Sequence, residues 1–421
     1  MSAFAPFIFV IAAEPSGDAL GAALIGALRQ RTQGRVRIEG IGGERMAEAG
    51  VQSLFPLDDL AVIGIAEVLP RAPLILRRVR EAVTAVRRAQ PDAVVTIDSS
   101  GFSWRVAHGL RRRGERLPLI HYVAPMVWAW RAGRARRMAR WYDHLMALLP
   151  FEPPYFERVG LSCAWVGHPV VESGAERGDG GRFRAMHGLT ADDLLLSVLP
   201  GSRAGEVHRL LPVFGAALER LQQRIGGFRV AVPTVATVAS AVAEGVRAWP
   251  GAPIVVHTPQ AKYDAFAASR AALAASGTVA LELAMARLPM AVAYRLNRLT
   301  EAVLARVLKV RQVNLVNLVL GRPLVEELLG PACTPERLAQ AVEPLLCDEE
   351  VRARHLAGYD EAMRRLGAGL ASPSLRAADQ VLAIVAVRRG CRGKPIPEKG
   401  DQDDDGQYRQ VLLSAHDDPR A

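Results

Sequence analysis

A carboxylate follows a short apolar run in the first quarter of the chain. Residues 93–97 read Ala-Val-Val-Thr-Ile, and Asp98 comes next. Such a run is typical of a buried strand, so Asp98 is expected where that strand ends, at the edge where parallel sheets bind ligands. There it could act as a general base and remove a proton from an attacking hydroxyl. From the sequence alone, capping of the next helix explains Asp98 equally well.

A polar turn follows the first apolar run, residues 7–13. It contains Glu14, Ser16, Gly17 and Asp18 and leads into a segment with helical spacing. Free N–H groups at a helix N-terminus could bind an anion or a sugar here. Taken by itself, the turn is better explained as an ordinary strand-to-helix connection with Ser16 or Asp18 as the N-cap.

Two tryptophans, Trp128 and Trp130, lie between His121 and an arginine-rich segment, residues 131–140. Aromatic faces beside cations can bind sugars and phosphates, or nucleic acid. Packing of both rings in a core, with a solvated basic face beside them, is an equally good interpretation.

Two further turns precede predicted helices in the second half of the chain. The first, Gly201-Ser202-Arg203, offers backbone donors and a guanidinium that could clamp a diphosphate. The second, Ser276-Gly277-Thr278, leads to Glu282, which could accept hydrogen bonds from ribose hydroxyls. A lone glutamate on a helix is more often simply solvated.

Residues 68–80 combine apolar side chains with clustered arginines. Apolar insertion and charge attraction add at an anionic lipid surface, so this segment is a candidate membrane contact. An amphipathic helix that covers the sheet is the alternative. The residues assigned to the contact are Val68, Leu69, Leu74, Ile75, Leu76, Arg77 and Arg78.

The elements that must position these groups form two series of short apolar runs separated by helical segments. The pattern predicts an α/β protein with two doubly wound, Rossmann-like domains that face a cleft. We expect an N-terminal domain over residues 1–172, a hinge between 172 and 184, and a second domain over 184–347. Helices over 348–388 are expected to pack back on the first domain, and residues 390–421 to form a disordered tail.

Composition narrows the possible functions without choosing one. The chain has 421 residues and a formal net charge of +10, which favours anionic partners such as phosphorylated substrates, anionic lipid or nucleic acid. The four cysteines lack metal-site spacing, and no run of about 18 apolar residues occurs, so membrane contact would be peripheral. A reducing cytoplasm is the simplest expectation.

The motifs together resemble the lipid-A-disaccharide synthase family over roughly residues 7–385. No single motif is sufficient, but their order and spacing are specific. The segments that carry the resemblance are 14–18, 40–43, 61–64, 97–98, 121–123, 127–131, 150–152, 167–169, 199–203, 275–282, 294–295, 317–318 and 321–322.

The resemblance implies a GT-B fold and a metal-independent, inverting transfer without a cofactor. The implied donor is UDP-2,3-diacylglucosamine, and the implied acceptor is 2,3-diacylglucosamine 1-phosphate, whose 6-hydroxyl attacks. Asp98 matches the general base, and the turns around Arg203 and Ser276, with Glu282 and Asn317, match the donor side. The implied location is the cytoplasmic face of the inner membrane, as a peripheral monomer or homodimer that binds no nucleic acid.

Several residues depart from the family pattern. A second carboxylate is missing from Ser99-Ser100-Gly101, Ala124 and Met126 replace serines, and Val316 replaces a proline. These changes concern acceptor contacts more than the reaction class. The alternatives are another UDP-sugar enzyme with the GT-B fold, or a basic membrane- or RNA-binding protein without catalysis.

Overall fold

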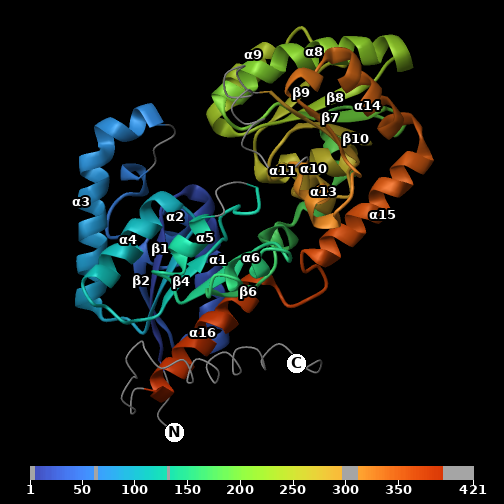
Figure 1. The fold of residues 1–421 in the computed structure, drawn as a ribbon. Helices are drawn as coiled ribbons and strands as arrows, with labels where there is room; N and C mark the ends of the chain where they lie inside the picture. Colours follow the sequence, from blue (N-terminus) through green and yellow to red (C-terminus); the bar gives the residue numbers. More distant parts are fainter. Residues whose placement is uncertain (1–4, 61–64, 130–132, 296–311, 392–421) are drawn as a thin grey trace.

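The structure, a computed structural model, describes residues 5–60, 65–129, 133–295 and 312–391, without the side chains of 65–70 and 391. Several predicted features therefore lie outside the described part: the 61–64 motif, Trp130 and Arg131, the side chains of Val68 and Leu69, and the tail from residue 392 onward. Figure 1 shows two lobes, each built around a sheet.

The N-terminal half forms a parallel six-stranded sheet in the order β2-β1-β3-β4-β5-β6. Its strands are β1 (Phe7–Ala12), β2 (Arg37–Ile41), β3 (Ala93–Ile97), β4 (Leu119–Tyr122), β5 (His144–Ala147) and β6 (Ser162–Trp165). Its helices are α1 (Pro15–Thr32), α2 (Glu44–Glu48), α3 (Ile65–Ala89), α4 (Ser100–Arg112), α5 (Gly133–Met138) and α6 (Pro153–Glu157). β3 and β4 are buried throughout because helices cover both faces of the sheet.

The second half repeats this plan with the order β12-β11-β10-β7-β8-β9. Its strands are β7 (Leu195–Leu199), β8 (Arg229–Pro233), β9 (Ile254–Val256), β10 (Ala271–Ala275), β11 (Met290–Tyr294) and β12 (Glu326–Leu329). Its helices are α7 (Gly180–Met186), α8 (Ala204–Ile225), α9 (Ala239–Gly245), α10 (Pro259–Ala268), α11 (Val279–Met285), α13 (Leu315–Leu320), α14 (Pro335–Cys347) and α15 (Glu349–Arg365).

The predicted fold class is confirmed, and each strand expected from an apolar run is present with slightly shifted ends. One edge strand, β12, was not predicted. It contains Glu326 and Glu327, so it lacks the apolar pattern by which the other strands were found.

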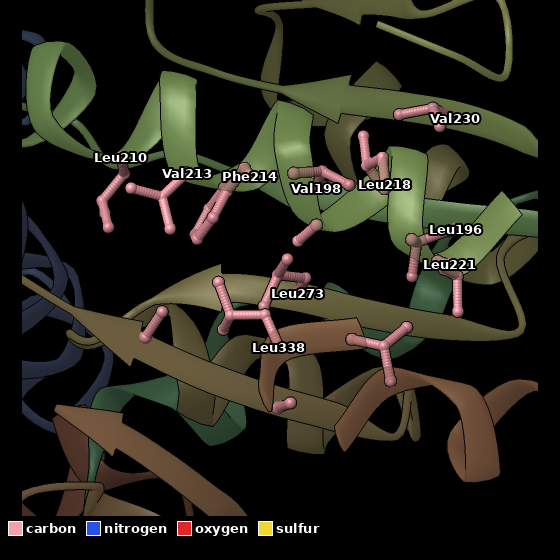
Figure 2. Packing of buried hydrophobic residues seen from close by; sticks show 14 of the residues in the cluster. Leu196, Val198, Leu210, Val213, Phe214, Leu218, Leu221, Val230, Leu273 and Leu338 are labelled. Carbon is pink, nitrogen blue, oxygen red and sulfur yellow. The ribbon is translucent and has the colours of Figure 1, made fainter. Parts of the chain in front are cut away.

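The core of the second half lies between α8, the sheet and α14 (Figure 2). Phe214, Leu218 and Leu221 come from one face of α8, and Leu273 of β10 and Leu338 of α14 lie in the same buried cluster. Their spacing of three to four residues along α8 places them on one stripe, which is why the helix lies flat on the sheet.

The chain crosses between the two sheets twice, after β6 and after α15. The last helix, α16 (Pro373–Cys391), returns to the first half, where Ala377, Ala378 and Val381 are buried in the same cluster as β1 (Figure 1). The predicted domain boundaries at residues 172 and 184 stay a prediction.

Replacing Phe214 by alanine tests the core of the second half. Phe214 has no exposed surface, so Phe214→Ala should lower the free energy of unfolding by about 3–5 kcal/mol. Urea denaturation followed by circular dichroism measures the change. The control is Leu370→Ala, because Leu370 is largely exposed and should change stability by about 0.5 kcal/mol or less. Equal effects of both variants would contradict the packing described.

Candidate active site

Asp98 lies at the carboxyl end of β3 in an unusual backbone conformation. Asp98 and Ser99 have φ angles of 50° and 42°, in the left-handed region that costs about 1–3 kcal/mol for residues other than glycine. The Asp98 carboxylate accepts hydrogen bonds from the Ser16 hydroxyl at 3.0 Å and from the Ser99 N–H at 2.8 Å. The N-cap of α4 is Ser99, so the helix-capping explanation of Asp98 is not supported.

The first turn of α1 presents Ser16 to this carboxylate. The helix begins at Pro15 with Glu14 as its N-cap, so the interpretation of Ser16 or Asp18 as the cap is wrong. Gly17 is needed for close packing, since a Cβ on it would lie 3.3 Å from the backbone oxygen of Ile97. This close approach brings the first turn of α1 beside the end of β3.

Asp18 is a buried residue that joins α1 to α2. It is buried, and its two oxygens accept from the backbone N–H groups of Gly43, Arg45 and Met46 at 2.6, 3.0 and 3.2 Å. These bonds fix the start of α2, so Asp18 has no free oxygen for an acceptor sugar. Its prediction as a cleft residue is not supported by this geometry.

Glu14 connects the two halves electrostatically. Its pKa is raised, first because burial disfavours the charged carboxylate and second because Asp98 carries a like charge. The Ser99 hydroxyl, by hydrogen bonding, and the positive charge of Arg203 lower the pKa. Arg203 follows the end of β7 in the second sheet, so the charge that lowers the pKa of Glu14 comes from the other half of the chain.

The Gly201-Ser202-Arg203 turn presents donors at the start of α8. Gly201 adopts a φ of 114°, which favours glycine. Ser202 and Arg203 are exposed, and the guanidinium contacts Glu206 at 3.0 Å. The turn, the N–H groups at the start of the helix and Arg203 supply the donors that an anion site requires.

The second turn and Glu282 also lie at the carboxyl edge of this sheet. The Ser276 N–H donates to Ala293 O at 2.9 Å, while Gly277 and Thr278 are exposed. Glu282 forms an ion pair with Lys262 at 2.6 Å. Sequence reasoning missed Lys262, and its only signal was a lysine in a chain whose basic residues are mostly arginine.

The polar atoms of the Asn317 side chain are all used in hydrogen bonds within the protein. Its Nδ2 donates to Val325 O and to Glu327 Oε1 at 2.8 and 2.7 Å, and its Oδ1 accepts from the N–H groups of Leu324 and Val325, each at 2.9 Å. The side chain is buried and has no group left for UDP. Its prediction as a donor-binding residue is therefore not supported by this geometry.

His121 is a core residue. Its Nδ1 lies 2.8 Å from the Thr96 hydroxyl, its ring packs against Tyr142, and burial lowers its pKa to about 3. A neutral imidazole enclosed in this way supports β3 and β4 from within the core.

Trp128 is half-buried at the junction between the halves. Its ring packs edge-on against Phe151, and its Nε1 donates to Glu152 at 3.3 Å. Burial raises the pKa of Glu152 to about 7. Leu149 and Val170 of the first half belong to the same buried cluster as Leu199 of the second, and Trp128 packs on that cluster.

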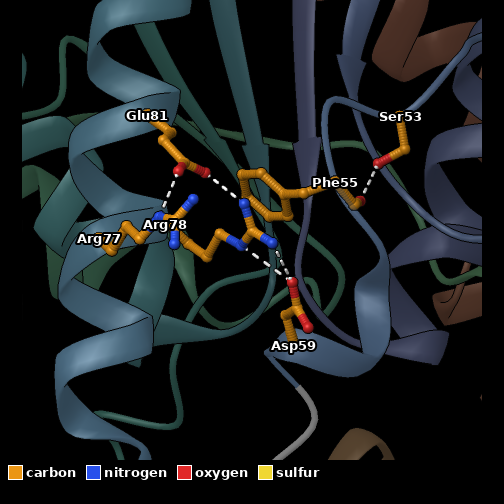
Figure 3. Close-up of polar contacts among 6 residues, drawn as sticks. All are labelled: Ser53, Phe55, Asp59, Arg77, Arg78 and Glu81. Carbon is orange, nitrogen blue, oxygen red and sulfur yellow. Dashed lines mark hydrogen bonds and ion pairs between the residues drawn. The ribbon is translucent and has the colours of Figure 1, made fainter.

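Some side chains of α3 pack on the core and others are exposed. Ile75 packs on the core, and Arg78 bridges Asp59 and Glu81 while it stacks 4.8 Å from the centre of the Phe55 ring (Figure 3). Arg77 is exposed and pairs with Glu81 at 2.8 Å. Leu76 is 49% exposed, so part of the segment is available to a membrane.

Within the described ranges, the structure contains no group of three His, Cys, Asp or Glu side chains that could hold a metal ion. In the same part of the chain, every helix is too short or too polar to cross a bilayer. Neither finding tests metal independence or location, which stay predictions.

A family model described as lipid-A-disaccharide synthetase matches residues 8–372. A lipid-A-disaccharide synthase from Rhodospirillum centenum is 57% identical over 381 residues, which cover 90% of this chain and 95% of that protein.

Two solved structures show the same architecture. MurG of Acinetobacter baumannii has a TM-score of 0.54 and 14% identity, covering 90% of this chain and 99% of its own. UDP-GlcNAc 2-epimerase from Neisseria meningitidis, bound to UDP-GlcNAc, has a TM-score of 0.58 and 10% identity. The match covers 91% of this chain and 99% of the epimerase chain. At these identities the likeness concerns the fold, which is GT-B.

The bonds of Asn317 predict a stability defect on its replacement. Asn317→Ala leaves the N–H groups of Leu324 and Val325 without their buried acceptor, which should lower the free energy of unfolding by about 2 kcal/mol or more. Thermal and urea unfolding measure this loss. Ser276→Ala serves as the control and should stay within about 0.5 kcal/mol of the parent protein. A fully stable Asn317→Ala protein with weakened UDP binding would restore the donor-site assignment.

Proposed function

Because the chain belongs to the lipid-A-disaccharide synthase family, as a glycosyltransferase with the GT-B fold, we propose that it couples two acylated glucosamine units. The proposed donor is UDP-2,3-diacylglucosamine, and the proposed acceptor is 2,3-diacylglucosamine 1-phosphate. The products are a β-1,6-linked disaccharide 1-phosphate and UDP.

The observation that supports the proposal is a held carboxylate, Asp98, at the end of β3, together with a held guanidinium, Arg203, at the start of α8. Ser16 and the Ser99 N–H hold the Asp98 carboxylate at the end of the first sheet. Arg203 acts on neighbouring Glu14 from the second sheet. A base on one side and a cation on the other are what a sugar transfer with an anionic leaving group requires.

The proposed step forms one bond and breaks another at the anomeric carbon of the donor. The acceptor 6-hydroxyl oxygen attacks this carbon while its proton passes to an oxygen of Asp98. The bond to UDP breaks with its electron pair on the β-phosphate oxygen. Arg203 and the N-terminus of α8 stabilise that developing charge, which they must do without help if the reaction is metal-independent, as we propose.

The remaining predicted side chains take roles that follow from their exposure. Gly201, Ser202 and the 276–278 turn would bind the diphosphate, and Glu282 the ribose. Glu14, Ser16 and the backbone at Gly17 would face the acceptor, with Trp128 at the edge of the site. These groups would be held in place by three buried residues, Asp18, His121 and Asn317.

We further propose peripheral binding at the cytoplasmic face of the inner membrane through α3. Leu74 is half-buried, Leu76 and Arg77 are exposed, and Leu54 and Arg80 line an adjacent groove of about 520 Å³. Exposed leucines among arginines suit an anionic lipid surface. The protein would act as a monomer or homodimer.

Asp98→Asn tests the base. The amide cannot accept the proton, so turnover should fall by at least about 100-fold, the lower range for general base catalysis. Disaccharide formation is measured by mass spectrometry. UDP affinity is measured by calorimetry and should stay within about threefold of the parent value. A variant that keeps substantial activity would remove Asp98 from this role.

Leu74→Ser combined with Leu76→Ser tests the membrane contact. Less apolar surface enters the lipid, so co-sedimentation with vesicles of phosphatidylglycerol and phosphatidylethanolamine should fall several-fold, since each buried CH₂ contributes about 0.8 kcal/mol. Met186→Ser is the matched control, because Met186 is 72% exposed on α7 of the other half. Vesicle binding that does not change in the double variant would argue against α3.

A further inference from the structure

We propose that Glu206 is a positioning residue for the transfer. Its buried carboxylate holds the Arg203 guanidinium and the Gly201 turn in the arrangement that receives the departing diphosphate. This inference rests on the proposed function and adds to it a residue that the sequence did not single out.

Glu206 lies in the first turn of α8 and is only 7% exposed. Its Oε1 contacts the Nη1 atom of Arg203 at 3.0 Å. The Arg203 side chain is otherwise open to solvent, with 69% of its surface exposed. A long, exposed arginine would sample many rotamers, so this single buried partner restricts where its charge lies.

The same carboxylate touches the turn. A Cβ placed on Gly201 would lie 2.9 Å from both Cβ and Oε2 of Glu206. One oxygen of Glu206 therefore faces the guanidinium, and the other lies beneath the backbone that presents Ser202. The two parts of the predicted diphosphate site share one support.

Ordinary helix capping does not account for this arrangement. A glutamate at the third helical position usually reaches back to the backbone N–H of the N-cap residue. Here the N-cap is Arg203, and the described hydrogen bond of the Glu206 carboxylate goes to the Arg203 side chain. A buried negative charge beside an anion site also repels the ligand, so a purely structural residue would be better placed elsewhere.

The function of the pair is preorganisation. An arginine already held at the α8 N-terminus need not be ordered when charge develops on the diphosphate, so its attraction is fully available in the transition state. Loss of Glu206 should therefore act through Arg203.

A double-mutant cycle with Glu206→Ala and Arg203→Ala tests this coupling. Glu206→Ala alone should lower kcat/KM by roughly 10-fold or more, the effect of losing one charge-assisted hydrogen bond. In the Arg203→Ala background, the same change should lower kcat/KM by less than about twofold. Glu206→Gln keeps one acceptor oxygen and should retain intermediate activity.

Two controls separate positioning from folding. Glu219→Ala, on an exposed site of the same helix, should leave kcat/KM unchanged. Melting temperatures of all variants are measured, and if Glu206→Ala fails to fold, the cycle is run with Glu206→Gln. Equal losses in both Arg203 backgrounds, or no loss in either, would overturn the proposal.

Failure of the proposed function can be distinguished from failure of the Glu206–Arg203 coupling. If the parent protein makes no disaccharide, the same cycle is run on UDP affinity by calorimetry. Non-additive effects on UDP affinity would then support the Glu206–Arg203 coupling although the acceptor is wrong, and additive effects would reject it.

Discussion

The site depends on two sheets whose carboxyl edges are held facing each other. Parallel strands bring their ends to one edge, but nothing within either sheet sets the position of the other. The two crossings of the chain do so: the His168 N–H donates to Leu366 O at 3.0 Å, and Glu172 accepts from the Ser374 hydroxyl at 2.6 Å. Arg376 stacks 4.4 Å from the centre of the Trp165 ring and donates to its backbone oxygen. These contacts fasten the two crossings of the chain to each other.

Within this frame, the charged groups of the site already have partners. Asp98 accepts from Ser16, Arg203 contacts Glu206, and Glu282 contacts Lys262. Such pairs restrict long side chains before a substrate arrives, and ligands can then exchange one partner for another. The strained backbone at Asp98 and Ser99 also restricts the site before a substrate arrives. The turn of α1 and the end of β4 hold this backbone in a conformation that a free chain would avoid.

The sequence predicted the strands and the two sheets because apolar runs of strand length repeat along both halves. It did not distinguish site residues from their supports. Asp18 and Asn317 belong to recognisable motifs, yet their side chains bind backbone groups of other segments of the chain, and such partners leave no local pattern. Lys262 was missed for the same reason, since its partner Glu282 lies 20 residues away. Glu206 was missed although Arg203 is close in the sequence, because the burial of its carboxylate exists only in the folded chain. β12 was not predicted because its glutamates interrupt the apolar pattern of a strand.

The most direct test is a transfer assay of the purified protein in detergent with EDTA. UDP-2,3-diacylglucosamine and 2,3-diacylglucosamine 1-phosphate are supplied, and UDP and the disaccharide are quantified by mass spectrometry. We predict one UDP released for each β-1,6-linked disaccharide 1-phosphate formed. A folded protein that binds UDP but forms no disaccharide with any acyl length, with or without added magnesium, would contradict the proposed acceptor and leave only the fold and the donor site.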